Sequence, residues 1–320
     1  MKKYFVWLVL FVCAALPLAA PAQVGDFDAL YVFGDSLSDT GNDLVLTKLL
    51  GIKPAIPPSE SPNRTYFNGR FSNGPIAFEY LWQALTANSK ANVVPSLALP
   101  NPNRNGAISY AFGGATSGLY SVTPGGFVVP GLLGQVEAYR FGLSGKRPKQ
   151  RALFAIWAGA NDYINLKPAD PLIVVKNIGR SIRRLYQIGA RQFIVLNLPD
   201  LGQIPAAQGN AAALSQLTSI HNALLDQTLN GLSETLPGIS VTKINVFNVA
   251  QSLLGSTIPG PALEFLAPGF SACLLLNPAT CPDVELTLSL PFFYWDVEHP
   301  TTLVHSVLGS AMFGALAPPP

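Results

Sequence analysis

Hydrophobic positions form two kinds of segment that alternate along the chain. Short apolar runs without helical spacing, at residues 29–33, 153–157 and 193–198, are typical of buried strands. Longer segments between them carry apolar residues every three or four positions, which predicts helices. Strands that alternate with helices favour a parallel sheet covered by helices on both faces, so the pattern predicts an α/β fold.

The helical segments carry start and stop residues. Asp170 followed by Pro171 predicts a helix start, and Gly189 marks the end of that helix. The string "FSNGP" before the apolar positions of residues 77–85 predicts another start, with the proline in the first turn. Further elements are expected as a helix at about 206–232, a strand from residue 239 and a C-terminal helix at 301–315.

Two stretches rich in proline, glycine and asparagine, at residues 53–75 and 95–106, predict long loops near strand ends. In parallel α/β sheets, loops at the carboxyl ends of the strands build the functional site. No linker divides the chain, so residues 23–320 are expected to form a single domain.

The N-terminus has the three parts of a secretory signal peptide. Lys2 and Lys3 precede an apolar stretch at residues 4–18, and Ala-Pro-Ala follows at residues 20–22. We therefore expect residues 1–22 to be removed and the protein to be secreted or periplasmic. An uncleaved membrane anchor is the alternative, but the prolines in this region disfavour a continuous helix.

Cysteine usage fits an exported protein. Cys13 leaves with the signal peptide, and Cys273 and Cys281 remain as an even pair. Export to an oxidising compartment favours a disulfide between them, whereas two unpaired buried thiols are the alternative.

Overall charge limits the classes of partner. The formal net charge is +2, and only 12% of residues are charged against 49% that are hydrophobic. This composition lacks the basic footprint of a nucleic-acid-binding protein. Low charge and a high hydrophobic content hint at an apolar surface that faces a lipid or acyl group, although an apolar core explains the composition equally well. The sequence does not indicate an oligomeric state.

The first apolar run ends in "FGDSLSDTGN", at residues 33–42, which places Ser36 just after a predicted strand. A serine hydroxyl is a weak nucleophile unless a base takes its proton. The chain has three histidines that could do so. His221 falls on the apolar stripe of a predicted helix, and His305 lies in the C-terminal helix, so both are expected to be mainly structural.

His299 is the strongest candidate for the base. It lies in "FYWDVEHPTT", three residues after Asp296. On a bent loop this spacing lets the carboxylate reach one ring nitrogen and fix the tautomer of the imidazole. Pro300 keeps the segment out of a helix. A surface turn is the alternative interpretation of this motif by itself.

Ester cleavage also requires hydrogen-bond donors for a developing oxyanion. "YAFGGATSG", at residues 110–118, offers amide groups in a glycine-rich turn, and "WAGANDY" places Asn161 after a predicted strand. The remaining polar residues of the first motif are expected to be local. Asp35 would bond the turn backbone or support the site, and Asp39 and Asn42 would be turn or cap residues.

These four blocks occur in one order along nearly the whole mature chain, and together the sequence resembles the GDSL or SGNH hydrolase superfamily. "GRFSNGPIAFEYL" and "NLPDLGQIP" are also similar to its secreted lipase/esterase, phospholipase-like branch. The resemblance implies a three-layer α/β/α sandwich around a five-stranded, flavodoxin-like parallel sheet. It also implies a secreted serine ester hydrolase that forms an acyl-enzyme and needs no cofactor or metal. Its substrate would be a small-molecule or lipid ester, with transient contact with lipid surfaces.

The resemblance further assigns roles to individual residues. Ser36 would be the nucleophile, with His299 as base and Asp296 as its carboxylate partner. The oxyanion donors would be the amide of Ser36, a glycine amide and the side chain of Asn161.

The two adjacent glycines leave the second of these donors ambiguous. Gly114 is favoured for this role, and Gly113 is the second choice.

Other activities remain compatible with these residues. Acyl transfer to an alcohol or deacetylation of a polysaccharide would use the same site. A metal hydrolase could use Asp296, Glu298 and His299, but the chain lacks paired histidine ligands. A secreted binding protein without activity would keep the fold alone.

Overall fold

The computed structural model describes residues 27–99, 106–164, 168–255 and 292–317. The predicted signal peptide at residues 1–22 and the predicted bond between Cys273 and Cys281 lie outside the described residues. Within the described ranges, no helix is both long enough and apolar enough to cross a bilayer.

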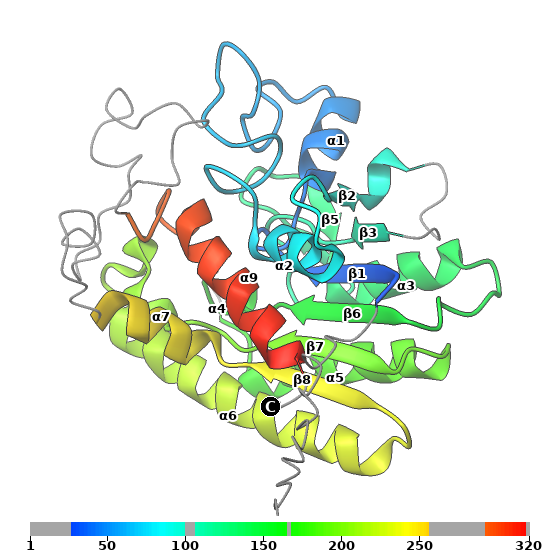
Figure 1. Ribbon diagram of the computed structural model, residues 1–320. Coiled ribbons are helices and arrows are strands. Elements are labelled where there is room, and N and C mark those ends of the chain that lie inside the picture. The colour runs from blue at the N-terminus through cyan, green and yellow to red at the C-terminus, as the bar shows by residue number, and fades with distance from the viewer. Residues whose placement is uncertain (1–26, 100–105, 165–167, 256–291, 318–320) are drawn as a thin grey trace, which may run out of the picture.

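A six-stranded sheet forms the centre of the fold, and every neighbouring pair of its strands is parallel (Figure 1). In spatial order its strands are β2 (Val93–Pro95), β3 (Gly106–Ser109), β1 (Ala29–Gly34), β6 (Ala152–Trp157), β7 (Gln192–Leu196) and β8 (Ser240–Ile244). The α/β fold is thus confirmed, but among the described residues the sheet has six strands, one more than the five expected. The additional strand, β2, is a three-residue edge strand that ends in proline, which is too short to give an apolar run.

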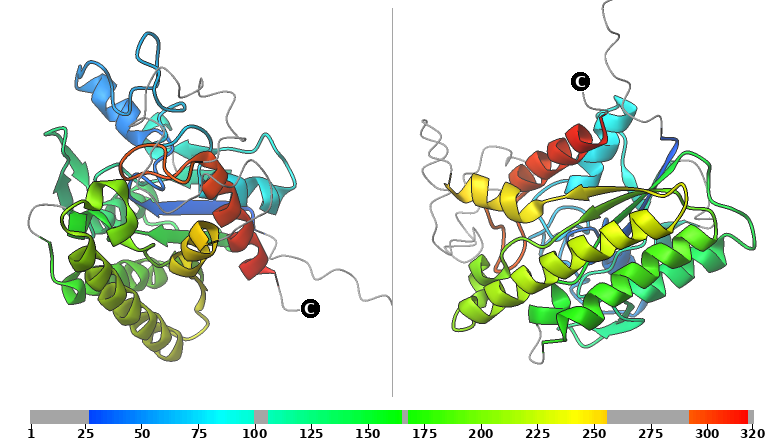
Figure 2. Two further views of the ribbon diagram at one scale, coloured as in Figure 1. Left: turned by 90° about the vertical axis from the view of Figure 1, so that its left-hand side faces the viewer. Right: turned by 90° about the horizontal axis from the view of Figure 1, so that it is seen from below.

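Helices cover both faces of this sheet, as the two further views make clear (Figure 2). One face is packed by α2 (Ala77–Thr86), α7 (Val246–Gly255) and α9 (Thr302–Leu316). The other is packed by α3 (Leu132–Gly142), α5 (Pro171–Gln187) and α6 (Ala211–Thr235). Shorter elements lie around them, namely α1 (Asn42–Leu49), α4 (Asn161–Ile164), an antiparallel hairpin of β4 (Tyr120–Val122) and β5 (Val128–Pro130), and the 3₁₀ turns η1 (Ser96–Ala98), η2 (Leu201–Gln203) and η3 (Pro205–Ala207).

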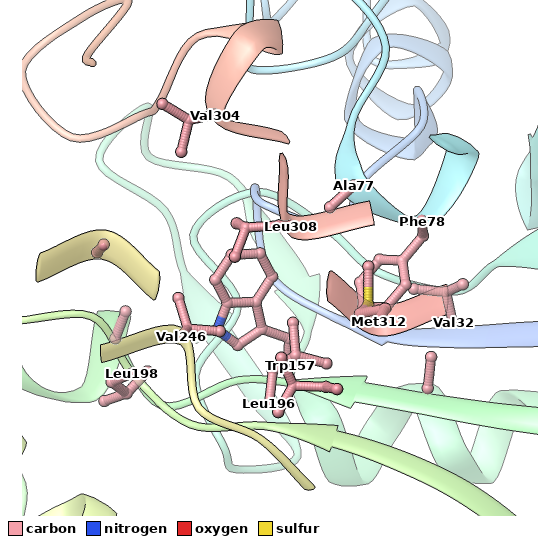
Figure 3. Close-up of a cluster of buried hydrophobic side chains, with 14 of the residues drawn as sticks. Val32, Ala77, Phe78, Trp157, Leu196, Leu198, Val246, Val304, Leu308 and Met312 are labelled. Carbon is pink, nitrogen blue, oxygen red and sulfur yellow. The ribbon is translucent and has the colours of Figure 1, made fainter. Parts of the chain in front are cut away.

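Trp157, the last residue of β6, lies in the core cluster beneath α7 and α9. Its indole lies among Val246, Leu308 and Leu196 (Figure 3). The ring nitrogen Nε1 donates to the Asn197 carbonyl at 3.1 Å, so the buried polar atom is satisfied. A large buried side chain therefore fixes the end of a central strand next to the helices.

Several element boundaries differ from the predicted ones. The helix predicted to open at "FSNGP" begins two residues later, at Ala77, and Pro75 lies outside it. The amide of Ile76 donates to Glu79 at 3.1 Å, which caps this start. By contrast, Asp170 caps α5 as expected, because its carboxylate accepts from the Leu172 amide at 2.8 Å.

Two other differences have local causes. The long helix predicted from residue 206 starts at Ala211, because residues 205–207 form the separate 3₁₀ turn η3 and Gly209, with φ of 88°, lies between that turn and the helix. The strand predicted from residue 239 ends at Ile244, and α7 follows at once. Asn245 accepts from the Asn248 amide at 3.0 Å and so acts as the helix cap that the sequence prediction overlooked.

Candidate active site

Strand β1 lies between β3 and β6 at the centre of the sheet. The strands that follow it first, β2 and β3, lie on one side of β1, and the later strands β6, β7 and β8 lie on the other, so the strand order reverses at β1. Open α/β sheets bind ligands at such a reversal of strand order, beyond the carboxyl ends of the strands. Ser36 follows β1, Gly113 and Gly114 follow β3, and Asn161 follows β6. The candidate residues from three separate motifs therefore emerge from three neighbouring strands.

Gly34 fixes the exit from β1 toward Ser36. A Cβ atom added at Gly34 would lie 2.1 Å from the Trp157 carbonyl oxygen, so only glycine fits this close approach. Gln135 of α3 holds both backbone groups of Gly34, accepting from its amide at 2.9 Å and donating to its carbonyl at 2.8 Å. Ser36 is thereby placed at the end of a strand whose position is fixed on two sides.

Three side chains from opposite ends of the chain meet at this point. The Oγ of Ser36 lies 2.8 Å from Nε2 of His299. The other ring nitrogen, Nδ1, lies 2.7 Å from Oδ2 and 2.9 Å from Oδ1 of Asp296. This is the serine–imidazole–carboxylate arrangement that activates a hydroxyl for attack on a carbonyl.

A tight turn explains why a spacing of three residues is enough for Asp296 to reach His299. The Trp295 amide donates to the His299 carbonyl at 2.7 Å, closing the turn. Within the turn, Oδ1 of Asp296 accepts from the amides of Glu298 at 2.8 Å and of His299 at 2.7 Å. The carboxylate is held by its own loop and can contact the imidazole from a fixed position.

The pKa values of Asp296 and His299 are shifted in opposite directions. Burial by itself would raise the pKa of Asp296, but His299 and the hydrogen bonds to the carboxylate lower it to about 2. Burial by itself would lower the pKa of His299, but Asp296 and, more weakly, Glu298 and Asp35 raise it above the ordinary 6.5. The carboxylate is therefore ionised at neutral pH and increases the basicity of the imidazole.

The two candidate glycines of the turn after β3 have different surroundings. The backbone of Gly113 lies beside the buried Asp43 carboxylate and opposes the rise in its pKa that burial causes. The amides of Gly114 and Ser36 have no hydrogen-bond partner within the described part of the chain. Gly114 also has φ of 71°, a left-handed conformation that favours glycine. Gly114 is therefore better suited than Gly113 to present a backbone donor.

Asn161 and its neighbour join the same turn to the end of β6. The side-chain amide of Asn161 donates to the Ala115 carbonyl at 3.1 Å. The carboxylate of Asp162 accepts from the backbone amide and the hydroxyl of Ser117, both at 2.8 Å. These contacts set the distance between the glycine turn and Asn161.

An apolar pocket opens beside Ser36 and His299. Its walls come from α4, α7, α9, the segment around η2 and the turn that contains His299. The aliphatic and aromatic lining residues include Ile164, Leu201, Val249, Leu253, Phe293 and Leu308. Asp35 and Glu298 also line it, and burial raises the pKa of Asp35 to about 7.

The other histidines lie in the core, as the sequence predicted. His221 is buried in α6, and its Nδ1 contacts the Tyr163 hydroxyl at 2.8 Å. His305 is buried in α9, and its ring nitrogens have no hydrogen-bond partner among the described residues. Burial lowers the pKa of both, to about 4 and about 3, so both are neutral at pH 7.

Asp39 and Asn42 were both expected to make only local contacts, and this expectation holds for Asp39 but not for Asn42. Asp39 is local, since its carboxylate accepts from the amides at the start of α1. Asn42 reaches further, because its side-chain amide donates to the carbonyls of Ser109 and Ala111, both at 2.9 Å. The first motif therefore also orients the segment that leads into the glycine turn.

Sequence reasoning missed two aromatic residues at the site. The Tyr66 hydroxyl donates to Oδ2 of Asp296 at 2.7 Å, and the ring of Phe71 lies against the His299 imidazole, with 5.1 Å between ring centroids. Both belong to the stretch predicted only as a long loop. The string "GRFSNG" around Phe71 signals a family likeness and a nearby helix start, but not a contact with His299. Across the described ranges, no group of three or more histidine, cysteine, aspartate or glutamate side chains is placed to hold a metal ion.

Comparison with known proteins agrees with this geometry. The family model described as GDSL-like Lipase/Acylhydrolase matches residues 30–312, and the chain belongs to this family. The match includes the whole of the site described above. The chain is therefore a GDSL-family ester hydrolase or acyltransferase.

Individual relatives are distant but similar over nearly their whole length. The chain is 29% identical to a phosphatidylcholine-sterol acyltransferase of Aeromonas hydrophila, over 96% of this chain and 95% of the relative. It is 27% identical to a GDSL esterase/lipase of Arabidopsis thaliana, over 85% and 84% of the two chains. It is also 26% identical to an inactive GDSL esterase/lipase-like protein of Arabidopsis thaliana, over 93% and 82%.

Proposed function

We propose that this protein cleaves carboxylic esters through an acyl-enzyme formed on Ser36. The observation that carries this proposal is the 2.8 Å contact between Oγ of Ser36 and Nε2 of His299. A serine hydroxyl at this distance from an imidazole can transfer its proton as it attacks. The ionised Asp296 on the opposite side of the ring supports the imidazolium that forms.

The reaction takes place in two half-steps. Nε2 of His299 accepts the Ser36 proton while Oγ attacks the ester carbonyl carbon, and the imidazolium then protonates the departing alcohol as its bond to carbon breaks. Water attacks the acyl-enzyme in the same way, giving its proton to His299. Collapse returns that proton to Ser36 and releases the acid.

The amides of Ser36 and Gly114 and the side chain of Asn161 would donate to the oxyanion in both half-steps. Their positions at the ends of three adjacent strands support this assignment. Donors held by a rigid sheet stabilise the developing charge without reorganising during the reaction. The engagement of Gly113 with Asp43 supports Gly114 as the glycine donor.

The substrate we propose is a lipid or acyl ester. The pocket beside Ser36 is lined mainly by aliphatic and aromatic side chains, which suits the hydrocarbon part of an acyl group. The family relationship to lipases and acylhydrolases supports the same class. Transient contact with lipid surfaces is part of this proposal.

A second candidate activity is transfer of the acyl group to an alcohol instead of water. It uses the same acyl-enzyme, with the alcohol in place of the attacking water. The similarity to a phosphatidylcholine-sterol acyltransferase supports it. We further propose export through residues 1–22, a single mature domain at residues 23–320 and a disulfide between Cys273 and Cys281, on the sequence features that predict them.

A series of p-nitrophenyl esters of increasing acyl length tests the proposed function. Wild type is expected to hydrolyse them, and Ser36→Ala is expected to lose that activity while its melting temperature stays near that of wild type. Adding an acceptor alcohol separates the two candidates, since acyl transfer yields a new ester and hydrolysis yields only acid. Equal rates in wild type and Ser36→Ala would contradict the mechanism.

A further inference from the structure

We propose that Tyr66 is a positioning residue that holds the Asp296 carboxylate against His299, as part of a support loop formed by residues 58–73. This role rests on the proposed function of Ser36, His299 and Asp296, and it adds a residue outside the motifs that define their site. The inference is carried by the contacts of the support loop, which lies more than 220 residues from Asp296 in the chain.

The support loop is attached along the whole His299 turn. The indole Nε1 of Trp295 donates to the Thr65 carbonyl at 3.2 Å, next to Tyr66. Further along, the Ser72 hydroxyl donates to the Pro300 carbonyl at 2.9 Å. The "GRFSNG" string thus belongs to the surface that carries the histidine turn and does not begin a helix.

Among the described residues, Tyr66 makes the only hydrogen bond from this loop to the Asp296 carboxylate. Its hydroxyl donates to Oδ2 at 2.7 Å, and the same oxygen receives the closer contact from Nδ1 of His299, also at 2.7 Å. Oδ1 is held by two backbone amides of the turn. With donors on both oxygens, rotation of the carboxylate away from the imidazole would break hydrogen bonds.

Tyr66 remains a donor over the working pH range. Burial raises the pKa of its phenol, and the nearby Asp296 charge raises it further. A protonated phenol beside an ionised carboxylate forms a charge-assisted hydrogen bond, which is stronger than a bond between neutral groups. The pair therefore orders the carboxylate without adding a charge to the site.

Phe71 of the same loop packs on the His299 imidazole, the ring that Tyr66 positions through Asp296. Its ring lies 5.1 Å from the His299 imidazole at an interplanar angle of 30°, and 6.2 Å from the Tyr66 ring in an edge-on arrangement. The loop itself is anchored to α2, because the Arg70 guanidinium pairs with the buried Glu79 carboxylate at 2.5 Å. The imidazole is thus fixed by a hydrogen bond at its edge and by packing on its face.

Removing the Tyr66 hydroxyl has a specific electrostatic consequence. Without this donor, the charge of the Asp296 carboxylate is less neutralised and acts more strongly on His299, so the pKa of His299 rises. Besides Asp296, the ionisable groups that act on His299 are Glu298 and Asp35, and the substitution leaves both in place. His305 is neutral, and its pKa is lowered by burial and by His299. A tyrosine that served only as packing would not move this pKa.

The test compares Tyr66→Phe with Tyr80→Phe. Tyr80 is a matched control because its hydroxyl is also partly buried and also forms a 2.7 Å hydrogen bond, to Thr302 rather than to the site. The pKa of His299 is measured by NMR titration of its imidazole in the full chain, whose three histidines allow assignment by single variants. Ester hydrolysis is measured in parallel as kcat, KM and a pH profile.

For Tyr66→Phe we expect the pKa of His299 to rise by about half a unit or more, and kcat to fall about tenfold with little change in KM. Tyr80→Phe should match wild type in both. An unchanged pKa of His299 in Tyr66→Phe overturns the positioning role, even if kcat falls. Because the titration needs no turnover, a shifted pKa in a protein without Ser36-dependent esterase activity would support the role of Tyr66 and reject the proposed function.

Discussion

Oγ of Ser36 lies 2.8 Å from Nε2 of His299, although the two residues are 263 positions apart in the chain. Ser36 is held by the end of the central strand β1, and His299 by a turn that leads into α9. The contact therefore depends on α9 packing over the sheet. It is the relationship from which the expected behaviour of the protein follows.

The pH dependence of activity should report the ionisation of His299. Its pKa is raised above 6.5, and only the neutral imidazole can accept the Ser36 proton. We expect kcat/KM to fall as the pH drops through a value above 6.5. A pH profile of kcat/KM that stays flat down to pH 5 would contradict His299 as the base.

Asp296→Asn should lower the activity by about 10⁴-fold, because the imidazole loses its orienting charge.

Asn161→Ala tests the oxyanion site. Loss of one donor should lower kcat by about 100- to 1,000-fold with little change in KM. Asn177→Ala is the control, because the Asn177 side chain donates to the Ser117 hydroxyl at 3.1 Å and so contacts the same turn from outside the site. Steady-state kinetics should separate the two variants, and equal losses would assign Asn161 a merely structural role.

Gly34→Ala should destabilise the protein and lower its activity together. The new methyl group would lie 2.1 Å from the Trp157 carbonyl oxygen, which forces β1 and β6 apart just before Ser36. Such overpacking costs about 1–3 kcal/mol. Gly231→Ala, in α6 with open space around it, should instead raise stability by about 0.5–1 kcal/mol. Denaturant unfolding of both variants measures the contrast, and equal stability of Gly34→Ala and wild type would contradict the packing argument.

Asp35→Asn should change how stability depends on pH. The pKa of Asp35 is raised from 3.8 to about 7, mainly by burial, so its contribution to stability is complete below about pH 4 and is lost as the pH rises through 7. Asparagine has no such loss. The free energy of unfolding of the variant minus that of wild type should therefore increase from pH 5 to pH 8, by on the order of 2 kcal/mol. Unfolding measured at both values tests this, and a difference that does not vary with pH would contradict it.

Local patterns were enough to predict the central part of the fold. Apolar runs marked β1, β6 and β7, and the cap at Asp170 marked α5, because each of these depends on neighbouring residues. The three residues of β2 could not be found in this way. A short edge strand is defined by pairing with β3, and that pairing is not encoded in its own residues.

The same distinction between local and long-range contacts applies to the residues of the site. Ser36 and the Asp296–His299 pair belong to motifs in which close spacing reflects close contact, so the sequence identified them. Tyr66 contacts Asp296 across 230 positions, and nothing in its surrounding sequence indicates a carboxylate partner. The choice of Gly114 over Gly113 likewise rests on a contact between Gly113 and Asp43 that only the folded chain brings together.

The role of Ser36 as an activated nucleophile can be tested by labelling with a fluorophosphonate, a reagent that reacts with activated serines, followed by mass spectrometry of the digested protein. We expect one adduct, on the peptide that contains Ser36. We also expect no adduct in Ser36→Ala and much slower labelling in His299→Ala. An adduct on another serine, or no labelling of the folded wild type, would contradict the assignment of Ser36 as an activated nucleophile.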